Sequence, residues 1–490
     1  MAPGRVLVVG AGLGGIATAL RLAVRGHSVT LLERGERIGG KMNRWQRDGY
    51  TFDTGPSLIT MPEVFAELFS LAGADIHRQL QLRRLDPVAS YRFADGSSFR
   101  YGQSLPLLQA ELQREFPYDI EGFHRLMALG GRLFELSRRT FFADTPGEPP
   151  DPSMAGALKY MPLRHGWGNY DATVRSFVRD ERLISFFGRY ATYVGSSPYQ
   201  APATLLAIPY LEYAHGAWYF QGGLYSLVEA LHALLLQYGV EIRCGASVSR
   251  IIQRNGGVAA VSLEDGMELD GDIVIFNGDS ARLPMLLGES ESPAEDRRSM
   301  SGFVMLLGID GKLPTQPHHS VYFSDNYSLE FDQLNGITNG GPGFPEDPTV
   351  YVNMPSASDN TLAPPDCESL FIMANCPADD DWNEEKTQRA RRLVLQRLQR
   401  SGFPDITDRI RVEQLWTPAC ISSAYDMPGG AIYGQDSHGW RNTFLRPANR
   451  HRRVRGLYRV GGSSHPGGGT PTVLLSAAIV DRLVERYEGA

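Results

Sequence analysis

The N-terminal residues show a short apolar run, a segment with one apolar face and a second apolar run in close succession. Residues 5–9 (Arg-Val-Leu-Val-Val) predict a buried strand, residues 14–25 predict an amphipathic helix, and residues 27–33 predict a second strand. Two strands joined by a helix form a βαβ unit, in which the strands pair in parallel. The chain is therefore expected to begin with an α/β fold.

The pattern changes to short β segments between residues 239 and 279. Asn-Gly-Gly at 255–257 and Asp-Gly at 265–266 are turn signals of β-hairpins. The expected strands are 240–243, 248–254, 258–263, 267–269 and 272–276. This part is therefore expected to be hairpin structure.

The remaining segments differ in their period. Residues 61–238 are mostly helical in period, and residues 300–420 mix strand-like and helical pieces around loops rich in proline and glycine. Near the end, residues 456–460 predict a strand, residues 461–469 form a glycine-rich loop, and residues 471–487 predict a helix.

Composition and charge limit the class of protein. The 490 residues allow two or three domains at about 150 residues each, and 42% are hydrophobic, which is enough for a large core. The formal net charge is −7, so we expect no nucleic-acid partner, because binding to phosphates needs a positive field. The four cysteines (244, 367, 376 and 420) form no C-x-x-C pair and are too few for a disulfide framework. They favour a reducing compartment.

No segment predicts a signal peptide or a membrane-spanning helix. The apolar stretch 6–20 contains four glycines, follows a single charge at Arg5 and precedes no cleavage-site pattern. No run of 18 uninterrupted apolar residues exists in the sequence. We therefore expect a cytoplasmic protein.

A glycine motif lies between the first predicted strand and helix. Gly10, Gly12 and Gly15 form G-x-G-x-x-G, with Leu13 and Gly14 inside it. The three glycines permit the tight turn, the approach of a pyrophosphate to the backbone and the packing of helix on strand. The helix N-terminus supplies amide groups to the phosphates. This context predicts a dinucleotide site of the Rossmann type.

Glu33 ends the second predicted strand, 21 residues after Gly12. A carboxylate at this position accepts hydrogen bonds from both ribose hydroxyls and repels a 2′-phosphate. The sequence therefore favours FAD or NAD over NADP.

Further segments favour FAD. The loops 34–41 and 50–57 resemble the extended flavin site of the amine oxidase and carotenoid desaturase superfamily, and the segment around Val248 resembles its adenine-contacting strand. The additional cofactor-binding residues that this resemblance implies are Arg34, Gly40, Lys41, Gly55, Pro56, Ser57, Val248, Gly461 and Gly462.

The second glycine loop opens the C-terminal helix. Pro471 suits the first helical turn, and the amide groups of Thr472 and Val473 are expected to face a group that gains negative charge. In a reduced flavin that group is the N1–C2=O edge. The helix end would then favour transfer of hydride to the flavin.

Residues 10–41, 52–57, 218–224 and 461–476 together resemble the bacterial phytoene desaturase family, in the same order over nearly the full length. The most specific piece is the loop from Gly461 to Val473. The resemblance implies an α/β fold with a Rossmann-type FAD-binding domain, of the two-dinucleotide-binding-domain flavoprotein type, joined to an α+β substrate domain with a helical cap.

The expected division assigns five segments to these parts. The FAD-binding domain would comprise residues 1–75, 236–290 and 421–490, and the substrate part would comprise the helical cap region 76–235 and the segment 291–420. Residues 215–219 and 467–476 also resemble late-pathway members, which include hydroxycarotenoid 3,4-desaturases, diapocarotene desaturases and terminal-methyl oxygenases.

The resemblance implies removal of a hydride and a proton from adjacent carbons of a long apolar polyene, a carotenoid. Such carbons offer no polar handle, so the enzyme needs a hydride acceptor above the carbon and dry surroundings. His465 is the titratable residue that the glycine loop would hold nearest the flavin, either as a base or as a histidine that orders the loop. No second G-x-G-x-x-G exists for NAD(P), so quinone or oxygen, or another protein, would exchange electrons with the cofactor.

Other functions stay open on the sequence alone. Within the same family these are a terminal-methyl oxygenase and a polyene saturase, which needs an external reductant. From other classes they are an amine-oxidising flavoenzyme and a catalytically silent flavin-binding protein.

A water-insoluble substrate implies peripheral contact with the cytoplasmic membrane. The aromatic-rich segments 183–193 and 205–220 would line a tunnel, form a membrane patch or pack in the core. The segment 446–459 contains six arginines and no acid, so it would contact anionic lipid head groups or form a solvated loop.

Overall fold

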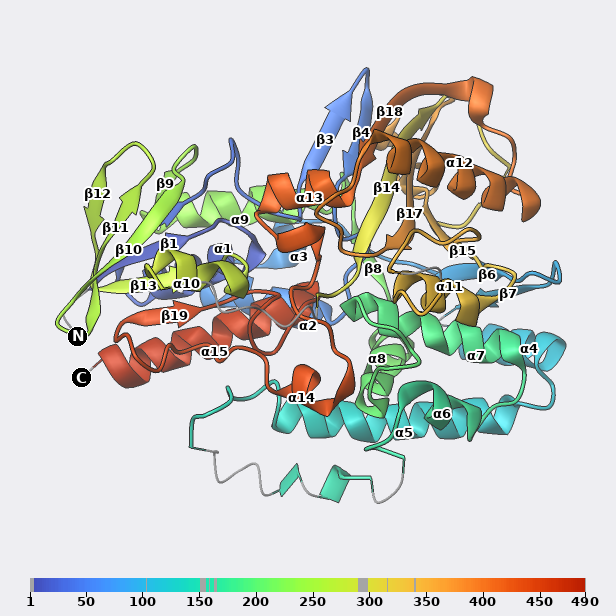
Figure 1. Cartoon of the computed structure of the whole chain (residues 1–490), viewed down its shortest axis with the longest axis horizontal. Coiled ribbons are helices and arrows are strands. Elements are labelled where there is room, and N and C mark those ends of the chain that lie inside the picture. The colour runs from blue at the N-terminus through green and yellow to red at the C-terminus, as the bar shows by residue number, and fades with distance from the viewer. Residues whose placement is uncertain are drawn as a thin grey trace.

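The computed structural model describes residues 4–102, 104–149, 156–157, 159–162, 165–289, 298–314, 316–338 and 341–489. It contains two larger sheets, a smaller three-stranded sheet and a group of helices beneath the second large sheet (Figure 1). Both ends of the described chain lie on the same side of the molecule, beside the first sheet (Figure 1).

The first sheet carries the predicted dinucleotide site. Its five strands are all parallel, and their order is β19 (Leu457–Arg459), β13 (Ile273–Phe276), β1 (Arg5–Val9), β2 (Ser28–Leu32) and β9 (Glu241–Arg243). Two predicted hairpin strands, 240–243 and 272–276, therefore belong to this parallel sheet, and their assignment to hairpins was wrong. Both strands are so short that the alternation of apolar and polar residues does not indicate which strand they pair with.

Alternate residues of β1 face two different layers. Val6 and Val8 pack with α1 (Leu13–Val24), α9 (Tyr225–Gln237) and α15 (Thr470–Glu488). Leu7 and Val9 face the opposite side, where they pack against the three-stranded sheet. All four side chains are 9% exposed or less, as expected for a strand that is covered on both faces.

The three-stranded sheet has the predicted hairpin topology. It consists of β10 (Val248–Arg254), β11 (Gly257–Leu263) and β12 (Glu268–Asp270), which pair antiparallel in this order. The turns fall at the Asn-Gly and Asp-Gly pairs, as the sequence predicts.

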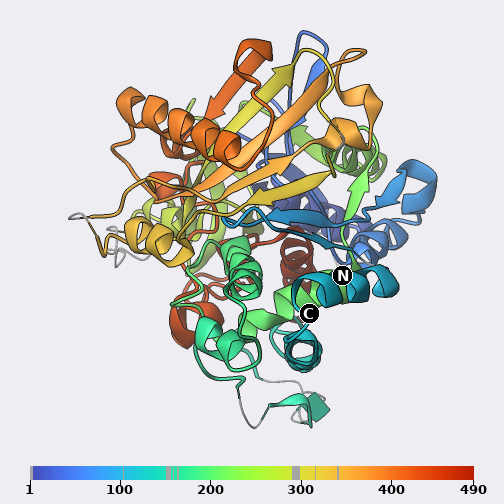
Figure 2. The same cartoon turned by 90° about the vertical axis from the view of Figure 1, so that its right-hand side faces the viewer.

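The second large sheet has seven strands. Their order is β18 (Ile410–Trp416), β14 (Ser301–Ile309), β17 (Glu368–Cys376), β16 (Val350–Asn353), β15 (His319–Tyr322), β6 (Ala89–Arg92) and β7 (Ser98–Tyr101). One face packs against α12 (Glu384–Arg400), and the other face joins the main core (Figure 2).

Residues 61–238 are less uniformly helical than predicted. β6 and β7 lie in this segment, and two further short strands pair as β5 (Leu82–Arg84) with β8 (Trp218–Phe220). Strands of three or four residues give too few positions for a period of two to stand out. A separate hairpin is formed by β3 (Arg44–Arg47) and β4 (Tyr50–Asp53).

The helices of residues 105–215 lie below the seven-stranded sheet in both views (Figures 1 and 2). Between β4 and β9 the helical elements of the described residues include, besides α9, α2 (Pro62–Leu71), α3 (Ile76–Gln79), α4 (Leu105–Glu115), α5 (Ile120–Arg139), α6 (Tyr170–Arg175), α7 (Glu181–Gly188), η2 (Arg189–Val194), η3 (Ala203–Leu206) and α8 (Ala207–His215). The later ones include α10 (Leu283–Leu286), α11 (Tyr327–Leu334), α13 (Pro418–Tyr425) and α14 (Gly439–Phe444). Among the described residues, no helix has the length and hydropathy needed to cross a membrane.

Candidate functional site

The glycine motif occupies the turn between β1 and α1. Gly10 has a φ of 96°, which favours glycine, and Leu13 is the first residue of α1. A Cβ atom at Gly15 would overlap the carbonyl oxygen of Gly10, so only glycine allows this approach of helix to strand. The backbone geometry therefore agrees with the two roles predicted for these glycines, the tight turn at Gly10 and the packing of helix on strand at Gly15.

Glu33 lies directly beside this turn, just after β2. Its Oε2 accepts a hydrogen bond from the Ala11 N–H at 2.8 Å, and its Oε1 accepts one from the Gly35 N–H at 2.8 Å. Each carboxylate oxygen keeps a second lone pair, so both can still accept a ribose hydroxyl. The Ala246 N–H donates to the Glu33 carbonyl at 2.8 Å, which places the segment leading to Val248 next to the same carboxylate.

The two glycine loops, far apart in sequence, meet at Gly14. A Cβ atom at Gly14 would lie 3.3 Å from the Gly461 Cα and 3.1 Å from the Val473 Cγ1. A Cβ atom at Gly462, the next residue of the second loop, would lie 3.4 Å from the Gly468 Cα. One dinucleotide can therefore reach the N-termini of both α1 and α15.

Asn277 connects the loops, and the sequence analysis missed it. Its Nδ2 donates to the Gly10 carbonyl at 3.1 Å, and its side chain lies next to Gly12, Gly14 and Gly461. The available signal was the position of Asn277 after a buried strand, β13. That strand was assigned to a hairpin, so its carboxyl end was not considered part of the site.

One prediction for the second loop is wrong. α15 begins at Thr470 after the N-cap Gly469, and the Val473 N–H donates to the Gly469 carbonyl at 3.0 Å. Val473 is the fourth helical residue, the first that can bond back to the N-cap carbonyl. Of the two amide groups predicted to face the cofactor, only that of Thr472, one residue earlier, can therefore do so.

The loops 34–41 and 50–57 pack onto the first glycine turn. A Cβ at Gly40 would lie 2.9 Å from the Gly12 Cα, and a Cβ at Gly55 would overlap the Lys41 carbonyl oxygen. The Lys41 Nζ donates to the Ile432 carbonyl at 2.5 Å, and burial lowers the pKa of Lys41 to about 8. These glycines, Lys41 and the first motif are thus brought together.

Arg34 has a different environment from the other predicted cofactor residues. It is exposed, and its Nη2 donates to the Ser423 carbonyl in α13 at 2.6 Å. This hydrogen bond connects the loop after β2 to α13, a helix far away in the sequence.

Asp53 joins two segments on which the family resemblance depends. Its carboxylate accepts hydrogen bonds from the Leu224 N–H at 2.9 Å, the Tyr225 N–H at 3.2 Å and the Tyr219 hydroxyl at 3.3 Å. Burial nevertheless raises the pKa of Asp53 to about 6. The loop that contains Pro56 and Ser57 is therefore anchored to the N-terminus of α9.

His465 is enclosed by protein atoms. It is 1% exposed, its Nε2 donates to the Phe141 carbonyl at 2.6 Å, and its ring lies 4.4 Å from the Phe141 ring. The His465 carbonyl accepts hydrogen bonds from Asn449 at 2.9 Å and Ser476 at 2.8 Å, and burial lowers the pKa of the imidazole to about 4. These contacts favour the role of ordering the loop over that of a base.

The first of the two aromatic-rich segments, residues 183–193, lies mainly in the core. Leu183, Phe186, Phe187 and Tyr190 are each 1% exposed or less and belong to the main hydrophobic cluster. Core packing therefore accounts for most of the segment 183–193.

A polar group that the sequence analysis did not single out adjoins Ser57. The Ser57 Oγ lies 2.6 Å from the Tyr351 hydroxyl, and the Arg189 guanidinium lies over the Tyr351 ring at 5.2 Å. We call the following residues the Arg189 cluster: Arg189, Tyr91, Tyr190, Tyr193, Glu212, His319 and Tyr351.

Two glycine loops that converge beside Glu33, on a parallel sheet next to a seven-stranded sheet, define an α/β Rossmann-type flavoprotein. The glycine cradle and Glu33 fit the phosphates and ribose of FAD. The family model for flavin-containing amine oxidoreductases matches residues 13–480, and the chain belongs to this family. It is an oxidoreductase whose cofactor is FAD.

Similar proteins of known name extend over nearly the whole chain. A 4,4′-diapolycopene oxygenase of Methylomonas sp is 34% identical over 98% of this chain and 98% of its own length. A zeta-carotene-forming phytoene desaturase of Myxococcus xanthus is 33% identical over 97% and 93%, and a 1-hydroxycarotenoid 3,4-desaturase of Flavobacterium sp. (strain P99-3) is 32% identical over 98% and 99%. The predicted resemblance to the phytoene desaturase family is thereby confirmed.

A solved structure supports the fold. An oxidoreductase from Methanosarcina mazei aligns over 98% of this chain and 100% of its own, with a TM-score of 0.63 and 19% identity. The predicted α/β flavoprotein architecture is confirmed at this level.

Proposed function

We propose that the protein is an FAD-dependent carotenoid desaturase, which removes a hydride and a proton from adjacent carbons of a long polyene. The observation that carries the proposal is the full-length similarity to three proteins whose names all state a carotenoid reaction. When bound, FAD supplies the hydride acceptor that an unactivated C–H bond requires. The proton, acidified as the hydride leaves, goes to water or to a weak base.

The predicted cofactor residues have distinct proposed roles. The first glycine turn binds the pyrophosphate, Glu33 binds the adenosine ribose, and the strand at Val248 contacts adenine. Gly461, Gly462 and the amide of Thr472 approach the flavin ring from the C-terminal loop. Their support is the convergence of both loops at Gly14 and Asn277.

The Arg189 cluster argues against oxidation of an amine. An amine substrate would need aromatic rings that are free to receive its positive charge. Here the chain's own guanidinium lies over the rings of Tyr91, Tyr193 and Tyr351 at 6.0, 5.1 and 5.2 Å. A second cation at the same rings would be repelled.

Product analysis tests the reaction. The purified holoenzyme is incubated with an acyclic carotenoid and the product is identified by mass and absorption spectrum. A desaturase product has lost two hydrogen atoms and absorbs at longer wavelength. A product with fewer double bonds would replace the proposal by a saturase, and turnover of an amine alone would replace it by an amine oxidase.

Oxygenation of a terminal methyl group is the second candidate. It is favoured by the Methylomonas relative, a 4,4′-diapolycopene oxygenase, at 34% identity. The same incubation under ¹⁸O₂ separates the two functions, because only the oxygenase product carries the label. Unlabelled product with an additional double bond supports the desaturase.

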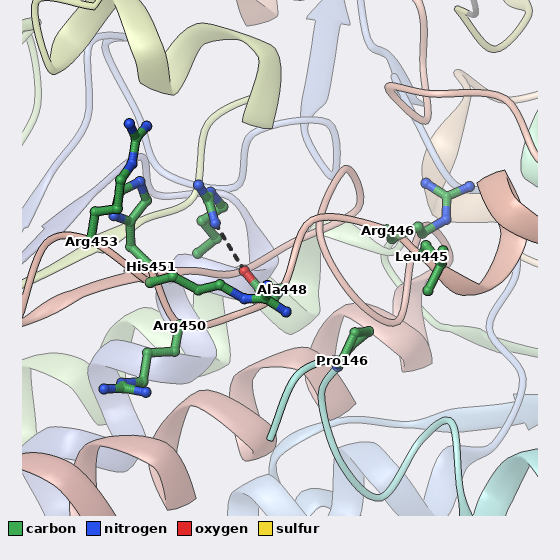
Figure 3. A pocket seen from close by; sticks show the side chains of 9 residues that line it. Pro146, Leu445, Arg446, Ala448, Arg450, His451 and Arg453 are labelled. Carbon is green, nitrogen blue, oxygen red and sulfur yellow. Dashed lines mark hydrogen bonds between the residues drawn. The ribbon is translucent and has the colours of Figure 1, made fainter. Parts of the chain in front are cut away.

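We propose a cytoplasmic protein bound peripherally to the cytoplasmic membrane, where its substrate dissolves. In support, a pocket of about 450 Å³ opens beside the arginine-rich segment and is lined by Pro146, Leu445, Arg446, Ala448, Arg450, His451, Arg452, Arg453 and Arg459 (Figure 3). Leu445 is 56% exposed, and Arg452 and Arg453 are exposed as well. Exposed apolar and basic side chains in one place suit the surface of an anionic bilayer.

A further inference from the structure

Arg189 is a half-buried cation that forms no ion pair with a described residue. It follows α7 and begins η2, and its Nη1 donates to the Tyr193 hydroxyl at 2.8 Å. Within the described part of the chain, no carboxylate forms an ion pair with Arg189. A guanidinium has five N–H donors, so this environment leaves most of them unused.

The acidic residue of the cluster, Glu212, forms no direct ion pair with Arg189. Glu212 is 1% exposed and accepts hydrogen bonds from the Tyr190 hydroxyl and, at 3.3 Å, from the Tyr193 hydroxyl. Tyr193 therefore stands between the guanidinium and the carboxylate. Burial raises the pKa of Glu212, against the opposing effects of the Tyr190 hydrogen bond and of the charge on Arg189.

Other polar atoms of the cluster also lack partners. The Tyr91 hydroxyl and the His319 Nε2 are buried and form no hydrogen bond among the described residues. Tyr91 is fully buried, whereas Arg189 is only partly covered by protein. Buried polar groups are nearly always hydrogen-bonded, so the unpaired Tyr91 hydroxyl and His319 Nε2, beside a partly exposed guanidinium, indicate a ligand that brings a polar atom to this place.

The cluster lies next to the proposed reaction site. The Tyr351 hydroxyl contacts both the Ser57 Oγ at 2.6 Å and the His319 Nδ1 at 2.7 Å. Ser57 belongs to the loop that is anchored through Asp53 and assigned to the flavin. A ligand of the Arg189 cluster would thus lie near the reacting carbons.

We infer that the Arg189 cluster binds an oxygen atom at the end of the polyene substrate. Arg189 is then the specificity-determining residue for polyenes whose terminal unit carries a hydroxyl or carbonyl group. This inference rests on the proposed function, because it names the substrate class of that site. A hydrocarbon end would leave the donors of Arg189 unpaired, which disfavours its binding.

The test uses a matched pair of acyclic polyenes that differ only in one hydroxyl group on the terminal unit. Wild-type holoenzyme is incubated without oxygen with each polyene and with excess quinone as electron acceptor, and kcat/KM for polyene oxidation is measured. We expect a preference of about 10- to 150-fold for the hydroxylated polyene, the effect of one hydrogen bond from a charged donor. Equal values for the two polyenes would overturn the inference.

Substitutions test whether the preference for the hydroxylated polyene depends on the Arg189 cluster. Arg189→Met should reduce the ratio of the two kcat/KM values to near one, mainly through KM, and Tyr193→Phe should reduce it partially. Arg179→Met, at an exposed arginine just before α7, serves as the control with an unchanged ratio. If Arg189→Met does not fold, the wild-type ratio and Tyr193→Phe still decide the question.

Two further outcomes are distinguishable. Loss of FAD from Arg189→Met, with Arg179→Met still loaded, would assign the guanidinium to the cofactor and overturn the inference. No oxidation of either polyene by the wild-type enzyme would contradict the proposed function itself.

Discussion

The Glu33 carboxylate accepts a hydrogen bond from the Ala11 N–H at 2.8 Å, so the residue proposed to bind the ribose and the turn proposed to bind the phosphates form one unit. Glu33→Ala removes this link and the two ribose contacts, each worth about 1.5–3 kcal/mol if desolvated. We expect the affinity for FAD to fall by at least about tenfold while the chain stays folded. Equilibrium dialysis at low FAD concentration measures the change.

A conservative control sharpens that experiment. Glu36→Ala removes an exposed acid three residues away and should leave FAD binding unchanged. Full FAD occupancy in Glu33→Ala would show that the carboxylate does not contact the cofactor.

The close approach of α1 to β1 predicts that one added methyl group at Gly15 destabilises the protein. Gly15→Ala places a Cβ against the Gly10 carbonyl oxygen, and overpacking of this kind costs about 1–3 kcal/mol. We expect a lower melting temperature and a reduced FAD-to-protein ratio. Gly343→Ala is the matched control, because a Cβ there meets no atom within 4 Å and its φ is not positive. Equal effects of the two substitutions would contradict the steric explanation.

Buried neutral histidines predict a loss of stability in mild acid. Burial lowers the pKa of His318 to about 3 and that of His465 to about 4, and the two side chains are 4% and 1% exposed. Below about pH 6.5 the unfolded chain takes up protons at these residues and the folded chain does not. Each histidine therefore lowers the free energy of unfolding by about 2 kcal/mol when the pH falls from 7 to 5.

Denaturant titrations at pH 7 and pH 5 test this dependence. His318→Gln should reduce the difference between the two free energies, whereas His77→Gln, at an exposed position, should not. An unchanged difference in His318→Gln would mean that His318 titrates normally in the folded protein.

The arginine-rich pocket predicts binding to anionic vesicles. Arg453 forms an ion pair with Glu289 at 3.0 Å, and Arg452 is exposed. Arg452→Glu together with Arg453→Glu should weaken flotation with anionic liposomes, by about 1 kcal/mol or more per residue. High salt should weaken the wild-type binding too, because it screens surface charge.

A charge-matched control lies on the three-stranded sheet. Arg250→Glu with Arg254→Glu changes the net charge equally at exposed positions of β10 and should leave flotation unchanged. Equal loss in both double variants would indicate a general charge effect rather than contact through the pocket.

Local sequence was sufficient for the dinucleotide turn and insufficient for the Arg189 cluster. The backbone geometry at Gly10 and Gly15, and the proposed role of Glu33, follow from a strand, a turn and a helix that are contiguous in the chain. The cluster instead combines residues of β6, η2, α8, β15 and β16, which only the tertiary fold brings together. Neither a period nor a short motif marks such residues.

β13 illustrates an intermediate case. Its four buried residues were predicted as a strand, but its parallel partners β1 and β19 lie far away in sequence. Turn signals nearby favoured a hairpin, so Asn277 at its carboxyl end was missed. Pairing of short strands depends on long-range contacts, which local turn chemistry does not specify.

The last prediction concerns the direction of electron flow. The amide of Thr472 lies in the first turn of α15, whose N-terminus stabilises nearby negative charge by about 0.3–2 kcal/mol. That sign favours a reduced, anionic flavin, and hence removal of hydride from the substrate. No second dinucleotide motif follows in the sequence for NAD(P)H. We therefore expect an acyclic carotenoid to bleach the flavin absorbance under anaerobic conditions, and added quinone or oxygen to restore it with one new double bond per turnover. Turnover that requires added NADPH would show that electrons flow toward the polyene or toward oxygen, and that the desaturase assignment is wrong.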